Sequence, residues 1–168
     1  QMLKGSRLSA WFCWLLGPCI ILGATSIVAA NDDGSQTMSL DPARPNSIVF
    51  APVEARFVRV DVAVSRGSQV CFDELEVYAP NSRENLAAAK AGTSATASSC
   101  LEGYAIHRIE HLNDGQYGNT RSWICGEQEG WAQIELPVVK TVDCVVFSRD
   151  REGRHEDRMP TRLSVSTS

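Results

Sequence analysis

The sequence predicts an all-β fold, a β-sandwich, and three observations support this. First, residues 131–136 alternate apolar and polar side chains, so Ala132, Ile134 and Leu136 would share one face of a strand. Second, similar short segments recur along the chain, separated by Gly, Pro, Asn and Asp. Third, almost no segment has the length and periodicity of a helix, which favours packed sheets.

The expected strands follow one another at short intervals. They are residues 47–50, 55–63, 71–78, 93–99, 131–136, 141–148 and 162–166. The strand at 71–78 breaks its alternation at Asp73 and Glu74, which indicates a β-bulge. The small, hydroxylated segment 93–99 suits an edge strand.

Two segments carry helical signals. Residues 81–91 are ambiguous, because their helix formers make only a short run before Gly92. Residues 105–112 predict about two helical turns that end at the Asn113-Asp114-Gly115 turn.

The first 30 residues resemble a secretory signal peptide, with basic Lys4 and Arg7, an apolar run, and small residues before Asn31. A secreted or cell-envelope protein is therefore expected. An uncleaved anchor is the alternative, since the run approaches the length that spans a bilayer. We expect residues 31–46 to be a flexible leader and residues 47–168 to be one domain.

Charge and cysteine content narrow the partners. The formal net charge is −4 and becomes more negative without the basic signal segment, which argues against nucleic acid and bulk anionic membrane. Four cysteines follow the signal segment: Cys71, Cys100, Cys125 and Cys144. Their spacing lacks a short Cys-x-x-Cys pair, so we expect two disulfides rather than a zinc site. The spacing leaves all three connectivities open.

Seven short motifs resemble the discoidin family, the coagulation factor 5/8 type C domains, which are galactose-binding-like jelly rolls. The family's opening motifs resemble Asn85-Leu-Ala, Ala97-Ser-Ser, Asn113-Asp-Gly, Trp123 and Trp131-Ala-Gln-Ile-Glu-Leu136, and its closing motifs resemble Ala55-Arg-Phe-Val-Arg59 and Glu74-Leu-Glu-Val-Tyr78. The resemblance implies a jelly-roll β-sandwich over residues 47–168.

The order of the motifs departs from the family, because the closing motifs precede the opening ones. We expect a circularly permuted domain, and the alternative is a junction between two domains. Residues 161–168 stop where such domains continue, so we expect the domain to be incomplete at its C-terminus and part of a larger polypeptide.

The resemblance also implies a structural Ca²⁺ site. Its ligands would be the side chains of Asp114, Glu74 and Ser122 or Thr120, with carbonyls near His111 and Gln116. Hard oxygen donors from irregular loops suit this ion. The alternative is that Asp114 caps a turn and Glu74 pairs with an arginine.

The glycan-binding residues implied by the resemblance lie in a charged loop, residues 148–158. Arg149 and Arg158 match the arginines of fucose-binding members, and His107, His111 or His155 would add an imidazole. Guanidinium groups donate paired hydrogen bonds that suit ring hydroxyls. The alternative is a loop of mutually compensating charges.

Aromatic groups offer further contacts with a sugar. Tyr104 and Tyr117 are candidates in expected loops, whereas Trp123 and Trp131 would either stack on a sugar or pack in the core.

Adjacent opening and closing strands would pair Cys71 with Cys100 and Cys125 with Cys144. The chain shows no strained nucleophile turn and no histidine metal triad, so we expect no enzyme. The expected function is a non-catalytic carbohydrate-binding or adhesion module for a glycan, cell-surface or matrix ligand. The alternative is a protein- or surface-interaction module without sugar affinity.

Overall fold

The computed structural model describes residues 29–30, 36–37, 39–63 and 68–168. These residues form β1 (Ala29–Ala30), β2 (Gln36–Thr37), β3 (Asn46–Ala63), β4 (Cys71–Phe72), β5 (Glu74–Tyr78), η1 (Ala89–Ala91), β6 (Ser94–Ala97), η2 (Ile109–Asn113), β7 (Trp123–Ile124), β8 (Glu129–Ser148) and β9 (Arg162–Thr167). Both η elements are short 3₁₀-helices. Within the described ranges, no helix has the length and apolar character that a bilayer crossing requires.

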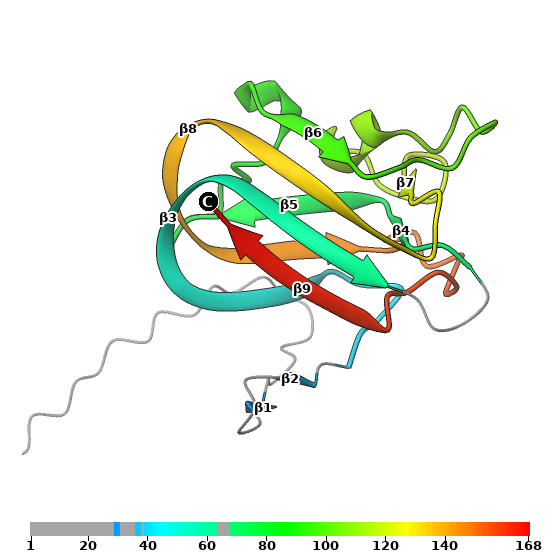
Figure 1. Cartoon of the computed structure of the whole chain (residues 1–168), viewed down its shortest axis with the longest axis horizontal. Helices are drawn as coiled ribbons and strands as arrows, with labels where there is room; N and C mark the ends of the chain where they lie inside the picture. Colours follow the sequence, from blue (N-terminus) through cyan, green and yellow to red (C-terminus); the bar gives the residue numbers. More distant parts are fainter. Residues whose placement is uncertain (1–28, 31–35, 38, 64–67) are drawn as a thin grey trace, which may run out of the picture.

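Two long, bent strands organise the fold. β3 and β8 pair antiparallel along most of their length, with register shifts between Val49 and Val53 and between Ala55 and Phe57. Both strands curve at the left of Figure 1, so each runs through both halves of the molecule. The sequence predicted two separate strands in each of these regions. The structure instead forms one continuous strand in each region. Pro137 lies within β8 and is exposed, in a stretch where β8 has no partner in β3. Its missing N–H therefore costs no hydrogen bond of the ladder.

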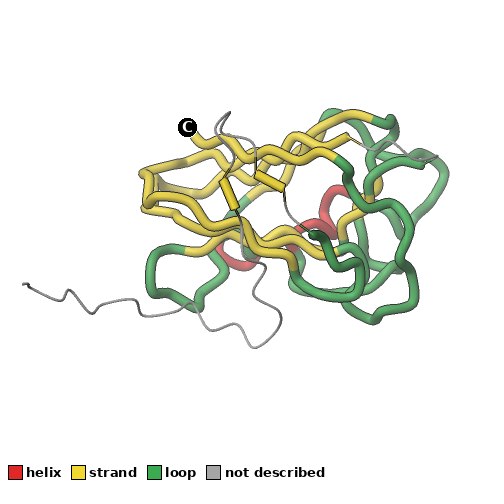
Figure 2. Tube along the Cα trace, turned by 90° about the horizontal axis from the view of Figure 1, so that it is seen from below, coloured by secondary structure: helices red, strands yellow, loops and turns green. Residues whose placement is uncertain are grey.

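The bends fold one antiparallel sheet into two layers, which Figure 2 shows from below. One layer has the order β5-β8-β3 and uses the second half of β8, and the other has β6-β8-β3-β9 and uses its first half. Val60 and Ile134 from one layer share a buried cluster with Val77 and Phe147 from the other. The all-β prediction is confirmed, and so is the inward face of residues 131–136.

The segment 93–99, expected to be an edge strand, contains β6, whereas the strand predicted at 71–78 divides. Among the described residues, β6 pairs with β8 alone and β9 with β3 alone. β4 pairs with β7, and β5 joins the main sheet, so the chain changes sheet at Asp73. The buried Asp73 carboxylate accepts hydrogen bonds from Gly118 N and Arg151 N, both 2.8 Å, and from the Ser148 hydroxyl. These bonds hold the turn that the broken alternation indicated.

The helical signals produce less helix than expected. Residues 105–112 give only η2, which is followed by Gly115 in a left-handed conformation. In residues 81–91 only the single turn of η1 forms, and Gly92 at φ 83° ends it. Both segments are held by contacts with the sheet rather than by helix length.

Most of the N-terminal predictions fall outside the described residues. Of the predicted signal segment, only β1 is described, and of the predicted leader, β2 and residues 39–46. Asn46 is buried and begins β3. Its side-chain amide donates to the carbonyls of Asp41 and Arg44, at 2.9 and 3.0 Å. The domain therefore includes part of the predicted leader.

Candidate functional site

The loops gather at one end of the two layers, on the right of Figure 1, opposite the bends of β3 and β8. Three segments far apart in the sequence meet there: the turn before β4, the long connection from β6 to β7, and the connection from β8 to β9. These segments carry a cationic cluster, defined as His107, Arg149 and Arg158. The start of β5 and the β6–β7 connection carry an acidic cluster, defined as Glu74, Glu76 and Asp114.

Arg149 anchors the cationic cluster. Its side chain is 1% exposed and follows directly from the end of β8. Its guanidinium donates to Asn119 Oδ1 at 3.1 Å, to the Asp157 carbonyl at 2.9 Å and to Asp157 Oδ1 at 2.7 Å. Five directed donors on a rigid plane explain how one side chain can fix two loops.

Arg158 shares the same carboxylate, with its Nε 3.4 Å from Asp157 Oδ2. It also donates to Gln69 Oε1 at 2.8 Å. Its backbone adopts φ 62°, a left-handed conformation that costs free energy for a residue with a side chain. The contacts of the Arg158 side chain with Gln69 and Asp157 offset part of this cost.

His107 completes the cationic cluster from the β6–β7 connection. Its Nδ1 lies 2.9 Å from Ser122 Oγ, and the Tyr104 ring lies 5.8 Å from its own. Burial lowers the pKa of His107, and the charges of Arg149 and Arg158 lower it further. The imidazole is therefore neutral at physiological pH and has both a donor and an acceptor nitrogen.

The acidic cluster lies where β5 meets the Asp114-Gly115 turn. Glu74 is fully buried, and its carboxylate accepts only long hydrogen bonds of 3.2 and 3.3 Å from Gly115 N. Burial, and next the charge of Glu76, raise the pKa of Glu74 to about 9. Glu76 itself is compensated, since Arg151 donates to it at 2.8 Å. Among the described residues no basic side chain forms an ion pair with Glu74, and the charge of Arg151 offsets only part of the rise in its pKa.

The predicted calcium ligands come together only in part. Glu74 and Asp114 are close enough to influence each other's charge, and this carboxyl pair fits a hard cation. However, Arg121 forms an ion pair with Asp114, and the Ser122 hydroxyl donates to the Asn119 carbonyl at 2.9 Å. In the described part of the chain, no group of three acidic, histidine or cysteine side chains is arranged for a metal.

The remaining predicted metal positions serve local structure. Nδ1 of His111 lies 3.1 Å from the carbonyl oxygen of Ile106. Gln116 N donates to Asp114 Oδ1 at 2.7 Å, and Thr120 is exposed. Asp114 thus caps its turn, as the alternative interpretation held, while Glu74 does not pair with an arginine.

The two candidate tyrosines have different environments. Tyr117 contacts the acidic cluster, because its hydroxyl donates to Glu76 Oε1 at 3.2 Å and Arg151 covers its ring at 4.1 Å. Tyr104 is 58% exposed and lies beside His107. The structure therefore places Tyr104, rather than Tyr117, beside the cationic cluster.

The two tryptophans also differ. Trp123 is fully buried in the core and donates to the Ser99 carbonyl at 3.0 Å, so it cannot stack on a ligand. Trp131 points away from the core, and the Arg59 guanidinium lies over its ring at 4.5 Å.

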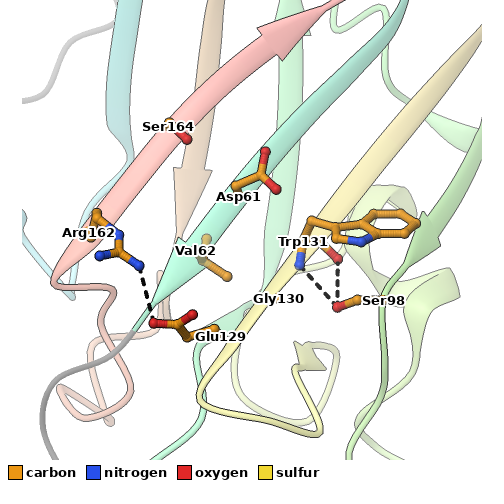
Figure 3. Close-up of a pocket in the computed structure, with 8 residues that line it drawn as sticks. All are labelled: Asp61, Val62, Ser98, Glu129, Gly130, Trp131, Arg162 and Ser164. Carbon is orange, nitrogen blue, oxygen red and sulfur yellow. Dashed lines mark hydrogen bonds and ion pairs between the residues drawn. The ribbon is translucent and has the colours of Figure 1, made fainter.

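Trp131 borders a hollow of about 430 Å³ between β3, β8 and β9 (Figure 3). Its lining residues are Asp61, Val62, Ser98, Glu129, Gly130, Trp131, Arg162 and Ser164. Arg162 donates to Glu129 at 3.1 Å, and Arg59 pairs with Asp61 at 2.6 Å. The charges around the hollow are therefore already paired with one another.

The structure separates both predicted disulfide pairs. Cys71 lies opposite Ile124 in the β4–β7 ladder, so the β7 segment stands between Cys71 and Cys100. Cys144 lies in β8 opposite Tyr78. The core cluster that contains Cys125 includes Val145 but not Cys144, so the Cys144 side chain lies on the other face of β8. Neither pair is joined in the structure.

Sequence reasoning found three of the clustered residues but missed their partners. Gln69 and Asn119 carry no motif, and Asp157 was visible only as one more charge in a mixed loop. No protein-family model matches this chain, and comparisons with curated proteins and with solved structures found no match.

Proposed function

We propose that this protein is a non-catalytic carbohydrate-binding or adhesion module of a larger exported protein. The observation that carries the proposal is the meeting of Arg149, Arg158 and neutral His107 at the loop end. These side chains come from two connections of the fold. Their donors and the free imidazole nitrogen suit the vicinal hydroxyls of a pyranose.

The proposed roles of the three residues differ. Arg149 is buried and bound on several sides, so it positions the loop. Arg158 has a side chain that is 24% exposed, and it would contact the ligand together with His107. Tyr104, exposed next to the imidazole, offers an apolar face to the sugar ring.

The proposed fold type is a circularly permuted, galactose-binding-like jelly roll of the discoidin kind. The strands that carry two of its motifs are direct neighbours, with Phe57 opposite Glu135 and Arg59 opposite Gln133. This adjacency supports a single domain over a junction of two.

A calcium ion is proposed as a brace for the loops. Glu74 and Asp114 would hold it, and the carbonyls of the surrounding turn would complete the shell. The uncompensated buried carboxyl of Glu74 supports a cation at this position. The ion would neutralise that charge and fix the turn that precedes the His107 partner Ser122.

A glycan array tests the function. The full chain should bind a defined sugar class in calcium and lose that binding in chelator. Arg158→Ala and His107→Ala should weaken binding at least tenfold. Arg154→Ala is the matched control in the same loop, because its side chain is 73% exposed and forms an ion pair with Glu152 rather than with Asp157.

The runner-up is a protein-interaction module of the same fold. It is favoured if the folded chain binds no glycan with or without calcium while it still binds a partner through the loop end. If the Arg158→Ala and Arg154→Ala variants bind the ligand equally well, the cationic cluster is not the binding site for a glycan or for a protein partner.

A further inference from the structure

Two cysteines that were not expected to pair lie opposite each other at the loop end. Leu101 N donates to the Ile124 carbonyl at 2.9 Å, and Gly126 N donates to Ser99 Oγ at 3.1 Å. A Cβ built on Gly126 would lie 3.2 Å from the Ser99 Cβ. These contacts run residues 99–101 antiparallel alongside residues 124–126, which sets Cys100 beside Cys125.

This register puts the two cysteines at a favourable spacing. A Cβ on Gly126 would also lie 3.0 Å from the Cys100 carbonyl oxygen, so the two backbones approach closely at the cysteines. Disulfides span Cα distances of about 4.4–6.8 Å, which suits such a close approach. The Cys125 thiol lies 3.4 Å from the hydroxyl of Ser99, the residue before Cys100, and a rotation about the Cys125 side-chain bond would turn it towards Cys100. Cys125 belongs to the core cluster, and Cys100 packs against that cluster.

The position and orientation of the other two described cysteines argue against either as the partner of Cys125. Cys71 lies opposite Ile124, and adjacent residues of a strand face opposite sides, so Cys71 and Cys125 point apart. Cys144 lies far along β8, opposite Val49 and Tyr78.

We propose that Cys100 and Cys125 form a disulfide bond that closes the segment 101–124 into a ring. The two thiols lose two protons and two electrons to an oxidised dithiol carrier or glutathione disulfide, which is reduced to two thiols. Half-buried Cys100 is the accessible entry point, so the mixed disulfide forms there and the Cys125 thiolate then attacks the Cys100 sulfur.

The ring would contain His107, Asp114 and Ser122, which belong to or contact both clusters. The bond would therefore restrain the loop that carries the candidate site. It stands independently of the proposed ligand, because it rests only on the register of residues 99–101 against residues 124–126.

Peptide mapping tests the proposal directly. The four cysteines fall on four different tryptic peptides, residues 67–83, 91–108, 122–140 and 141–149. The full chain is equilibrated with glutathione disulfide, alkylated and digested. We expect peptides 91–108 and 122–140 to appear joined and lighter by two hydrogen atoms. Recovery of both as alkylated peptides, or either joined to another cysteine peptide, overturns the proposal.

Thermal unfolding provides a second readout that does not depend on mapping. Oxidised chain should melt about 10 °C above the same chain reduced with dithiothreitol, because the ring constrains the unfolded state. In Cys100→Ser this difference should vanish, whereas Cys144→Ser should keep it. A difference that survives in Cys100→Ser places the bond elsewhere.

Discussion

The cationic and acidic clusters lie at the same end of the fold, yet their charges are balanced differently. Arg149 and Arg158 share the single carboxylate of Asp157, so the chain itself supplies a counter-ion for part of their charge. The pKa of Glu74 rises to about 9, first because the carboxyl is buried and next because of the charge of Glu76, and the charge of Arg151 offsets only part of this rise. The cationic cluster is therefore complete in the sense that its counter-ion and the acceptors of Arg149 come from the chain, whereas the acidic cluster is stabilised by a proton or by an added cation.

Arg149→Ala should have the largest effect on stability and tests the claim that the cationic cluster is complete. The change leaves a cavity and removes the donors to Asn119 and Asp157, so we expect a loss of about 3 kcal/mol in the free energy of unfolding. Urea unfolding measures it, with exposed Arg154→Ala as control. Equal urea midpoints for the Arg149→Ala and Arg154→Ala variants would mean that the Arg149 guanidinium does not stabilise the fold.

Calcium should have the next largest effect and tests the claim that the acidic cluster is incomplete. At a hundredfold excess of calcium over its Kd, the chain should gain about 2.7 kcal/mol. Differential scanning calorimetry with and without chelator detects the gain. Glu74→Gln should abolish it and Glu102→Gln, at an exposed site, should not. If the melting temperature of the wild type does not change with calcium, the buried Glu74 carboxyl is neutralised by a proton instead.

The pH dependence of stability should distinguish Glu74 in calcium-free buffer. The unfolded chain releases this proton near the ordinary glutamate pKa of 4.5, whereas the folded chain keeps it to about 9. Between these values the folded state binds the extra proton, so stability falls as pH rises, by up to about 1.4 kcal/mol per pH unit. Urea unfolding across this range should show a flatter profile for Glu74→Gln. If the wild type and Glu74→Gln lose stability in parallel as the pH rises, a group other than Glu74 causes the pH dependence.

The smallest effect concerns the backbone of Arg158. Arg158→Gly and Arg158→Ala both remove the guanidinium, but only glycine relieves the φ of 62°. The glycine variant should therefore be more stable than the alanine variant by about 1 kcal/mol. Neither should bind ligand as wild type does. An alanine variant as stable as the glycine variant would show that the loop relaxes once the side chain is gone.

The candidate site was predictable where a motif or a charge pattern carried it. Arg149 and Arg158 were named from motif resemblance and His107 as one of three candidate histidines, and in the structure the charges of both arginines lower the pKa of His107. Ser122 was expected at the metal but lies against His107 instead. Its hydroxyl can serve either partner, so the choice depends on the path of the connecting loop.

The cysteines illustrate the same limit. Their number and spacing indicated disulfides rather than zinc. Which cysteine faces which depends on the register of residues 99–101 against residues 124–126, and that register is set by loop hydrogen bonds rather than by alternation.

The sequence by itself determined the strand content and the inward faces, because the side-chain period of a strand is local and is written directly in residues such as Ala132, Ile134 and Leu136. Only the tertiary structure decided the two clusters and the facing cysteines. Those contacts join segments tens of residues apart, as with Arg149 and Asn119. They exist because β3 and β8 bend into two layers, and such long-range closure leaves no periodic trace in the chain.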